Sequence, residues 1–97
     1  MDSMHVVRHV LPLPGCLVLL EFEDRSLRVV DLAQFAQQGG ELARLANPEY
    51  VEQVRVDEEA GTIVWPDDLD LDPDVLYHEG RPLSGDDLRA FVQAHSH

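Results

Sequence analysis

The residues most able to do chemistry lie in one acidic stretch, residues 62–77, where five aspartates fall within eight positions. Three of these carboxylates and Glu79, just after the stretch, recur at a spacing close to that of a calcium-binding loop, whose ligands occupy alternate positions and end on a glutamate. These candidate ligands are Asp68, Asp70, Asp72 and Glu79. A calcium loop also needs glycine at its sharp turn, where this chain has Pro73, and proline favours the start of a helix instead. The divalent-cation site is therefore the less favoured interpretation.

The favoured interpretation is a helix start beside an acidic loop. Asp72 precedes Pro73, which is typical of an N-cap followed by the first helical residue. Trp65 is either a core residue, since tryptophan buries up to about 250 Å², or an exposed contact residue. Three aspartates then remain available to a partner. The partner-binding candidates are Trp65, Asp67, Asp68 and Asp70.

The histidines and the cysteine do not form a reactive group. His5 and His9 are four residues apart on a predicted strand, which separates them by about 13 Å, too far for one metal ion. We expect all five histidines to be exposed to solvent. Cys16 has no nearby cation and no histidine partner, so it is expected to be a core or loop residue and not a nucleophile. We therefore expect no catalytic residues, no cofactor and no enzymatic activity.

Composition and charge narrow the class of protein. The 97 residues are enough for a single domain, residues 1–97, with frayed ends at residues 1–4 and 95–97. The formal net charge is −12, which disfavours direct nucleic-acid binding and favours a basic protein partner. No apolar run reaches the roughly 20 residues of a membrane helix, and a lone cysteine suits a reducing compartment. We predict a cytoplasmic protein that binds no membrane.

Hydrophobic patterns predict the elements that must position the acidic loop. Strands are predicted for residues 5–11, 16–22, 27–32, 54–57 and 62–65. Short helices are predicted for residues 31–39, 41–53 in pieces, 72–80 and from residue 84 onward. This order indicates an α+β domain with a small antiparallel sheet of about five strands, in the order β-β-β-α-α-β-β-α-α, and short helices packed on it.

Polar residues predict where several helices begin. Asn47 precedes Pro48, which is again a cap followed by the first helical residue. Asp31 is also expected to be an N-cap that accepts from the amide of the third helical residue.

The last predicted helix begins at Ser84. Leu88, Phe91 and Val92 recur in it at i, i+3 and i+4, which gives it one apolar face. The edge strands of so small a sheet also offer a surface for pairing with a second copy, so a homodimer is one expected form.

Several short pieces of the chain match a known pattern. The most specific is Trp65-Pro66 followed by Asp70-Leu71 and Pro73-Asp74. The weaker pieces are Pro12-Leu13-Pro14, Leu17 to Phe22 with Asp24, Asp31-Leu32, Leu45, Pro48, Val54, Ile63-Val64 and Leu76-Tyr77. On these residues, which run from Pro12 to Tyr77, it resembles the small bacterial domain-of-unknown-function family twenty-four forty-two.

The resemblance implies an α+β domain with a small sheet and short helices. Some members of the family carry a repressor-like helix-turn-helix after this domain, and residues 81–97 are too few for one. The family usually has glycine after the aspartate of the first hairpin, where this chain has Arg25 after Asp24. No catalytic residues carry over. Stand-alone members look like accessory or regulatory proteins, sometimes discussed as antitoxin-like because of their gene neighbours.

The sequence thus predicts a non-enzymatic protein-binding or regulatory module, in the manner of an antitoxin-like accessory protein. The alternative is a divalent-cation-binding module that uses the acidic loop. The second alternative is an acidic DNA mimic, which requires a continuous acidic face on the fold.

Overall fold

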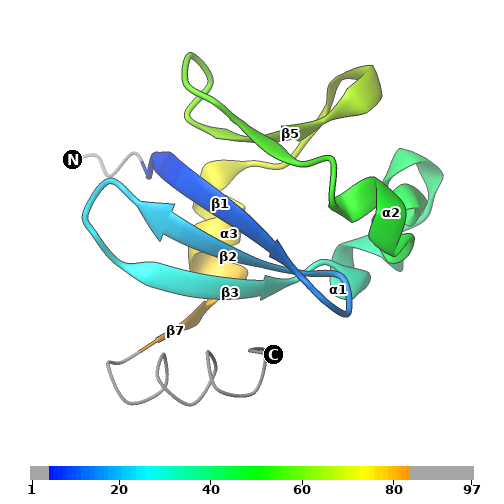
Figure 1. Cartoon of the computed structure of the whole chain (residues 1–97), viewed down its shortest axis with the longest axis horizontal. Coiled ribbons are helices and arrows are strands. Elements are labelled where there is room, and N and C mark those ends of the chain that lie inside the picture. The colour runs from blue at the N-terminus through cyan, green and yellow to red at the C-terminus, as the bar shows by residue number, and fades with distance from the viewer. Residues whose placement is uncertain (1–4, 84–97) are drawn as a thin grey trace.

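Alternating side chains in the first half of the chain build a four-stranded antiparallel sheet. The computed structural model of the chain describes residues 5–83. The strands of this sheet are β1 (Val7–Leu13), β2 (Leu17–Phe22), β3 (Leu27–Asp31) and β7 (Arg81–Pro82). They lie in the order β1-β2-β3-β7, so the two hairpins of the first half are extended by a short strand from the end of the described chain (Figure 1).

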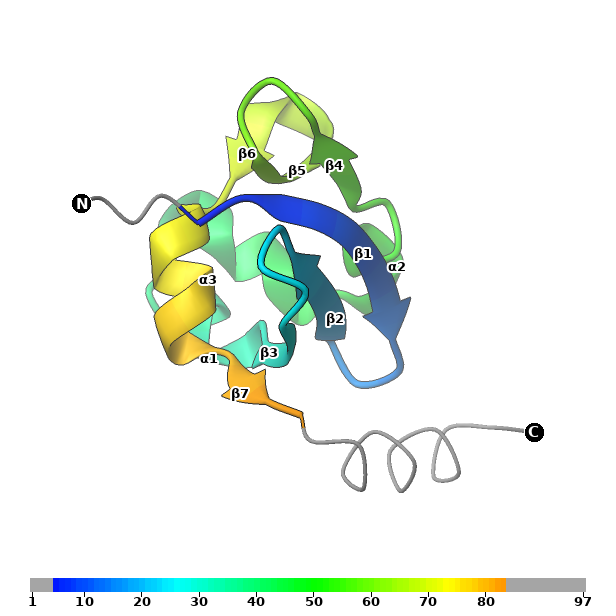
Figure 2. The same ribbon diagram turned by 90° about the vertical axis from the view of Figure 1, so that its left-hand side faces the viewer.

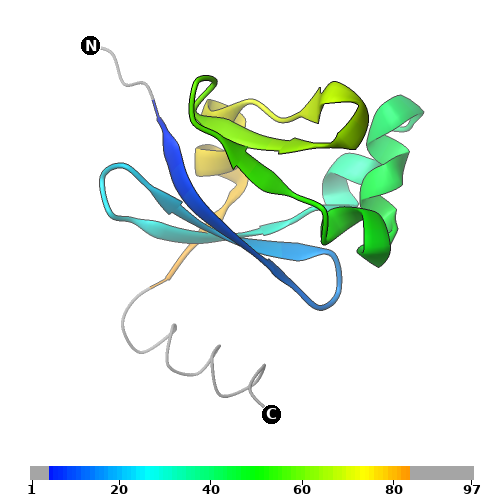
Figure 3. The same cartoon turned by 45° about the horizontal axis from the view of Figure 1, so that its top comes forward.

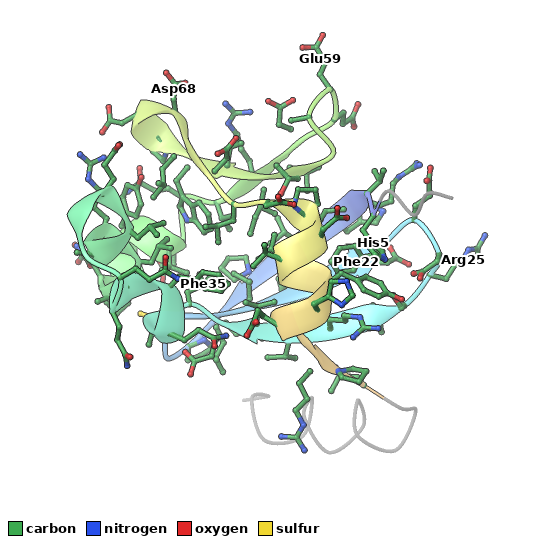
Figure 4. All side chains as sticks on the ribbon, turned by 180° about the vertical axis from the view of Figure 1, so that it is seen from behind. His5, Phe22, Arg25, Phe35, Glu59 and Asp68 are labelled. Carbon is green, nitrogen blue, oxygen red and sulfur yellow. The ribbon has the colours of Figure 1, made fainter. Side chains whose placement is uncertain are left out.

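One face of this sheet is buried. Val18, Leu20 and Phe22 alternate along β2, and all three point into the core together with Val30 of β3. The helix α3 (Pro73–Glu79) covers this face, since it lies behind the strands in Figure 1 and in front of them in Figure 4. The residues between them on β2 point to the opposite face.

A second, three-stranded antiparallel sheet lies above β1 (Figures 1 and 2). It contains β4 (Arg55–Asp57), β5 (Thr62–Trp65) and β6 (Leu69–Asp70), with β5 in the middle. All four residues of β5 are buried, as expected for a strand covered on both faces. The amide of Val7 donates to the carbonyl of Gly61 at 2.9 Å, which joins the two sheets.

Short helical segments close one end of both sheets, as Figure 3 shows. They are α1 (Ala33–Ala36), the 3-10 segment η1 (Gly40–Ala46) and α2 (Pro48–Val51). A further 3-10 turn, η2 (Pro66–Asp68), connects β5 to β6. The largest fully buried side chains come from every layer and form one core: Trp65, Phe22, Leu20, Leu32, Leu45, Ile63 and Leu76. Among the described residues, no helix is long and apolar enough to cross a membrane.

The predicted α+β class and the antiparallel pairing are confirmed, but the single five-stranded sheet is wrong. The strands divide into two sheets, and β6 and β7 are two-residue strands that carry no readable pattern. The predicted caps Asn47 and Asp72 are confirmed, since their side chains accept from the amides two residues on. The predicted helix from Ser84 and the predicted frayed ends lie outside the described residues.

Asp31 is not the N-cap of α1, contrary to the prediction. The residue at the N-cap of α1 is Leu32, and no side chain caps there. Asp31 instead ends β3, and its Oδ1 accepts from the amide of Ala33 at 3.0 Å. The carboxylate reaches only the first helical amide, because α1 begins at Ala33, two residues after Asp31.

Two turns of the first sheet place side chains in the left-handed region. Arg25 has a φ of 74°, the conformation that glycine adopts most easily. Cys16 has a φ of 60° and is buried, and its carbonyl accepts from the amide of Leu32 at 2.9 Å. Cys16 is thus both a turn residue and a core residue.

Candidate functional site

The acidic loop, residues 66–70, projects from the end of the three-stranded sheet. Asp67, Asp68 and Asp70 are exposed, while Leu69 between them is buried. Asp67 and Asp68 have φ angles of 67° and 61°, so two consecutive residues adopt the left-handed conformation. Aspartate tolerates this conformation better than most residues. The tight turn directs neighbouring carboxylates outward (Figure 4, Asp68).

Trp65 anchors the loop from below. Trp65 is 1% exposed, so it is a core residue. A partner could not contact it directly, and it is no longer a partner-binding candidate. Its Nε1 donates to the carbonyl of Val51 at 3.3 Å, which ties the start of the loop to α2. The ring of Tyr50 lies parallel to the indole with 6.4 Å between the ring centres. The Tyr50 hydroxyl donates to the carbonyl of Pro66 at 2.8 Å. The loop is therefore held at its first residue, Pro66, and at Trp65 directly before it.

One of the three exposed aspartates already has a partner. Nη1 of Arg44 lies 3.1 Å from Oδ2 of Asp67, and both side chains are largely exposed. An exposed pair of this kind contributes little to stability, typically about 0–1 kcal/mol. No hydrogen bond or ion pair from within residues 5–83 reaches the carboxylates of Asp68 and Asp70. These two are the most available carboxylates of the loop.

The four candidate cation ligands do not converge. Asp72 caps α3, with its Oδ1 2.8 Å from the amide of Asp74, and Glu79 is at the opposite end of that helix. Within the part of the chain that is described, no group of three histidine, cysteine or acidic side chains is placed to hold a metal ion. The spacing of Asp68, Asp70, Asp72 and Glu79 along the sequence is therefore not matched by proximity in space.

A second group of charged and aromatic side chains, which the sequence did not reveal, surrounds Tyr77 on α3. We name it the Tyr77 cluster. Its members are His5, Phe22, Asp24, Arg28, Asp74 and Tyr77. The His5 ring stacks on the Tyr77 ring with 3.7 Å between their centres. The guanidinium carbon of Arg28 lies 3.8 Å from the centre of the same ring. Two groups this close must lie on opposite faces, so Tyr77 is sandwiched between them.

Both carboxylates of the Tyr77 cluster are engaged. The Tyr77 hydroxyl donates to Oδ2 of Asp24 at 2.9 Å. Nδ1 of His5 donates to Oδ1 of Asp74, also at 2.9 Å. The hydroxyl and amide of Ser26 lower the pKa of Asp24, and the His5 ring lowers the pKa of Asp74. Neither carboxyl group is therefore suited to donate a proton near neutral pH.

The backbone at Gly80 lets the sheet approach α3 at this cluster. A Cβ at position 80 would lie 2.8 Å from the carbonyl oxygen of Leu76 and 2.9 Å from Cβ of Arg28. Only glycine fits there. Nε of Arg28 is buried without a hydrogen-bond partner, and the face of the Tyr77 ring provides its electrostatic partner instead.

Of the five histidines predicted to be exposed, His9 and His78 are exposed and His5 is not, while His95 and His97 lie outside the described residues. The side chain of His9 is 77% exposed. The side chain of His5 is only 19% exposed, because it is covered by Tyr77 and bonded to Asp74. The sequence signal for this contact is weak, since His5 and Tyr77 are far apart in the chain.

One comparison with known proteins identifies a family, and two find nothing. No curated protein and no solved structure gives a significant match. The family model described as Protein of unknown function (DUF2442) matches residues 7–82, more than three quarters of the chain. The match covers both sheets, the acidic loop and α3. The chain therefore belongs to the DUF2442 family of proteins of unknown function.

Proposed function

We propose that this protein is a non-enzymatic protein-binding module that receives a basic partner on its acidic loop. The observation that carries the proposal is the placement of Asp68 and Asp70. Both carboxylates are exposed and have no partner within the described residues, while the loop that bears them is held by Trp65 and Tyr50.

A loop that is already fixed binds at a lower entropic cost than a mobile one. Ordering a loop or a long side chain on binding costs about 0.5–1.5 kcal/mol per side chain. Here the indole of Trp65 and the carbonyl of Pro66 are bonded to α2, and the left-handed turn at Asp67 and Asp68 sets the direction of the carboxylates. An incoming arginine or lysine would find its acceptors preorganised.

The charge of the whole molecule supports the same partner class. The formal net charge of −12 would attract a basic protein at long range and speed its capture. The turn between β4 and β5 adds exposed Glu58 and Glu59. Figure 4 shows Glu59 and Asp68 at the same edge of the molecule, above the core. A basic partner would thus approach the three-stranded sheet along this edge.

An accessory or regulatory role, including an antitoxin-like one, follows if the partner is a basic protein whose own activity depends on the lysine or arginine side chains that the acidic loop would cover. This extension rests on the family resemblance and on the acidic loop together. The cation-binding alternative has no converging ligands to support it within residues 5–83. DNA mimicry stays a prediction, because the loop and the Glu58–Glu59 turn occupy one edge and not a whole face.

The test separates the effect of the acidic loop on binding from the effect of the net charge. The double variant Asp68→Asn/Asp70→Asn keeps the size of both side chains, and asparagine tolerates the left-handed turn at position 68. The double variant Glu58→Gln/Glu59→Gln removes the same charge from another exposed turn. Binding of a fluorescent oligoarginine peptide is measured by anisotropy for all three proteins, with pull-down from native lysate in parallel.

We expect the loop variant to bind the peptide several-fold more weakly than the turn variant, because one exposed charge pair is worth at most about 1 kcal/mol, roughly fivefold in affinity. Raising the salt concentration should weaken binding to the wild type most. Equal losses in the two variants would show that only net charge matters, and the proposed role of the loop would then be wrong.

A further inference from the structure

A positively charged side chain of the same chain already lies on the acidic loop. Nη1 of Arg44, from the 3-10 segment η1, donates to Oδ2 of Asp67 at 3.1 Å. The guanidinium carbon of Arg44 also lies 5.9 Å from the centre of the Tyr50 ring on α2, within the range of a cation–π contact. Figure 3 shows η1 and α2 beside the turn η2 that carries Asp67. The structure therefore shows a guanidinium bound where the loop meets α2.

The groups that bind this guanidinium are fixed in place. The Tyr50 hydroxyl donates to the carbonyl of Pro66 at 2.8 Å, and the Tyr50 ring stacks on the buried indole of Trp65. Asp67 follows Pro66 directly and has a φ of 67°, so the turn sets the position of its carboxylate. We call Tyr50 and Asp67 the guanidinium site. An aromatic ring beside a carboxylate suits arginine, whose planar cation can lie on a ring and bind a carboxylate at once.

Arg44 itself is held only weakly at the guanidinium site. Its side chain is 43% exposed, and that of Asp67 is 74% exposed. A pair exposed to this extent is worth at most about fivefold in an equilibrium constant. The hydrogen bond to Asp67 uses one of the five N–H donors of the Arg44 guanidinium. An arginine from another molecule can therefore replace Arg44 at little cost.

We propose that Arg44 is an internal competitor for the guanidinium site, and that an arginine of the basic partner displaces it. This inference rests on the proposed function and names the side chain that the partner contributes. A partner with several arginines can contact Asp68 and Asp70 as well, so it gains more than the exchange at Asp67 costs. A partner with one isolated cation has only the exchange. Arg44 thus selects for arginine-rich partners.

The first test compares two variants that each lose one arginine. Arg44→Gln empties the guanidinium site, whereas Arg81→Gln removes the same charge from exposed β7 on the other sheet. Binding of a fluorescent oligoarginine peptide is measured by anisotropy. We expect Arg44→Gln to bind the peptide up to about fivefold more tightly than the wild type, and Arg81→Gln to bind it almost as the wild type does. Equal affinities of the two variants would overturn the proposal.

A double-mutant cycle shows whether the gain depends on the guanidinium site. Arg44→Gln is combined with Asp67→Asn, since asparagine tolerates the left-handed turn at position 67. We expect the gain from Arg44→Gln to disappear in the Asp67→Asn background, because there the competitor has already lost its carboxylate. A gain that persists in this background would overturn the proposal.

The choice of arginine is tested with a second peptide. An oligolysine peptide of the same length should gain less from Arg44→Gln than oligoarginine does, because a lysine ammonium lacks the planar fork of a guanidinium. Equal gains for the two peptides would contradict the assignment of the site to arginine.

Displacement is observed directly through the Nε–Hε resonance of Arg44 in the full chain. We expect saturation with oligoarginine to move this resonance toward its position in the Asp67→Asn variant. An unchanged Arg44 resonance at saturation, together with shifted amides at Asp68 and Asp70, would overturn the proposal. The fluorescence of the buried Trp65 shows whether the core of each variant is intact. If Arg44→Gln disturbs the core, Arg44→Lys keeps the charge and provides the same comparison.

The loop variant Asp68→Asn/Asp70→Asn separates this inference from the proposed function. If this variant binds oligoarginine as tightly as the wild type, the proposed function is wrong. If it binds more weakly while Arg44→Gln and Arg81→Gln bind alike, the acidic loop keeps its proposed role and the internal competitor is overturned.

Discussion

The acidic loop and the Tyr77 cluster contain the same kinds of residue, but the carboxylates of the cluster are bonded within the described part of the fold and two of those in the loop are not. Each places aspartates beside an arginine and a tyrosine. In the Tyr77 cluster both carboxylates accept hydrogen bonds from neighbouring side chains, and the pKa of each is lowered. In the acidic loop Asp67 pairs with Arg44, while Asp68 and Asp70 have no such partner among residues 5–83. The residue types alone do not distinguish a structural carboxylate from an available one; the neighbours do.

The aromatic residues of the two regions differ in the same way. Trp65 lies beneath its loop in the core, so the loop rests on buried apolar area. Tyr77 is half-buried, and polar groups surround it on both faces and at its hydroxyl. We therefore expect the acidic loop to depend on the hydrophobic core, and the Tyr77 cluster to depend on many weak polar contacts.

The largest effect is expected at Trp65. Trp65→Ala removes a fully buried ring and should lower the free energy of unfolding by about 3–5 kcal/mol, out of a total of about 5–15 kcal/mol for a small domain. Urea unfolding measures it. Trp65→Phe retains much of the buried area and should cost clearly less. A loss below about 1 kcal/mol for the alanine variant would mean that the loop does not rest on the core.

A smaller loss is expected at Tyr77. Tyr77→Leu keeps an apolar side chain but abolishes the stacking with His5 and the contact with Arg28, which together are worth about 1–2 kcal/mol. The matched control is Val75→Ala on the exposed side of α3, which should change stability by less than about 0.5 kcal/mol. If Tyr77→Leu cost as much as Trp65→Ala, the contrast between a core-based loop and a polar cluster would fail.

A gain in stability is expected at Asp68. Its φ of 61° is costly for any residue with a Cβ, so Asp68→Gly should raise the free energy of unfolding by up to about 1 kcal/mol. Asp70→Gly removes the same side chain from strand β6 and should lower it by about 0.5–1 kcal/mol. Thermal unfolding of the pair provides the comparison. A loss of stability in Asp68→Gly would show that the aspartate makes a local contact that outweighs the strain.

The smallest effect is a difference in acid sensitivity. The pKa values of Asp24 and Asp74 lie below their ordinary value of 3.8. A carboxyl group with a lowered pKa contributes stability that is present above its unfolded-state pKa and is lost as the pH falls through its folded-state pKa. Stability of the wild type should therefore decline below about pH 4. The double variant Asp24→Asn/Asp74→Asn should start less stable at pH 6 and decline less. Parallel declines in the two proteins would contradict the assignment.

The parts of the fold that depend on local chemistry were predictable from the sequence. The start of α2 at Asn47-Pro48 and of α3 at Asp72-Pro73 follows from the residues that form each cap. The hairpin between β2 and β3 follows from two apolar runs that flank a polar turn. In each case the interacting atoms are only a few residues apart.

Other features depend on contacts that the sequence does not display. The strands β6 and β7 contain two residues each, too few for any alternation, and their pairing depends on where the preceding element ends. The contact between His5 and Tyr77 joins the first described residue to α3 across the edge of the sheet. At the acidic loop, the exposed aspartates were predicted, but the anchoring by Tyr50 required the structure.

The buried thiol of Cys16 can report how often the turn between β1 and β2 opens. This is the only thiol in the chain, and it is shielded from solvent in the folded state. A thiol reagent can reach it only when the turn between β1 and β2 opens, so the rate of alkylation measures how often this end of the sheet separates from the core. No engineered label is needed to compare the opening of the variants described above.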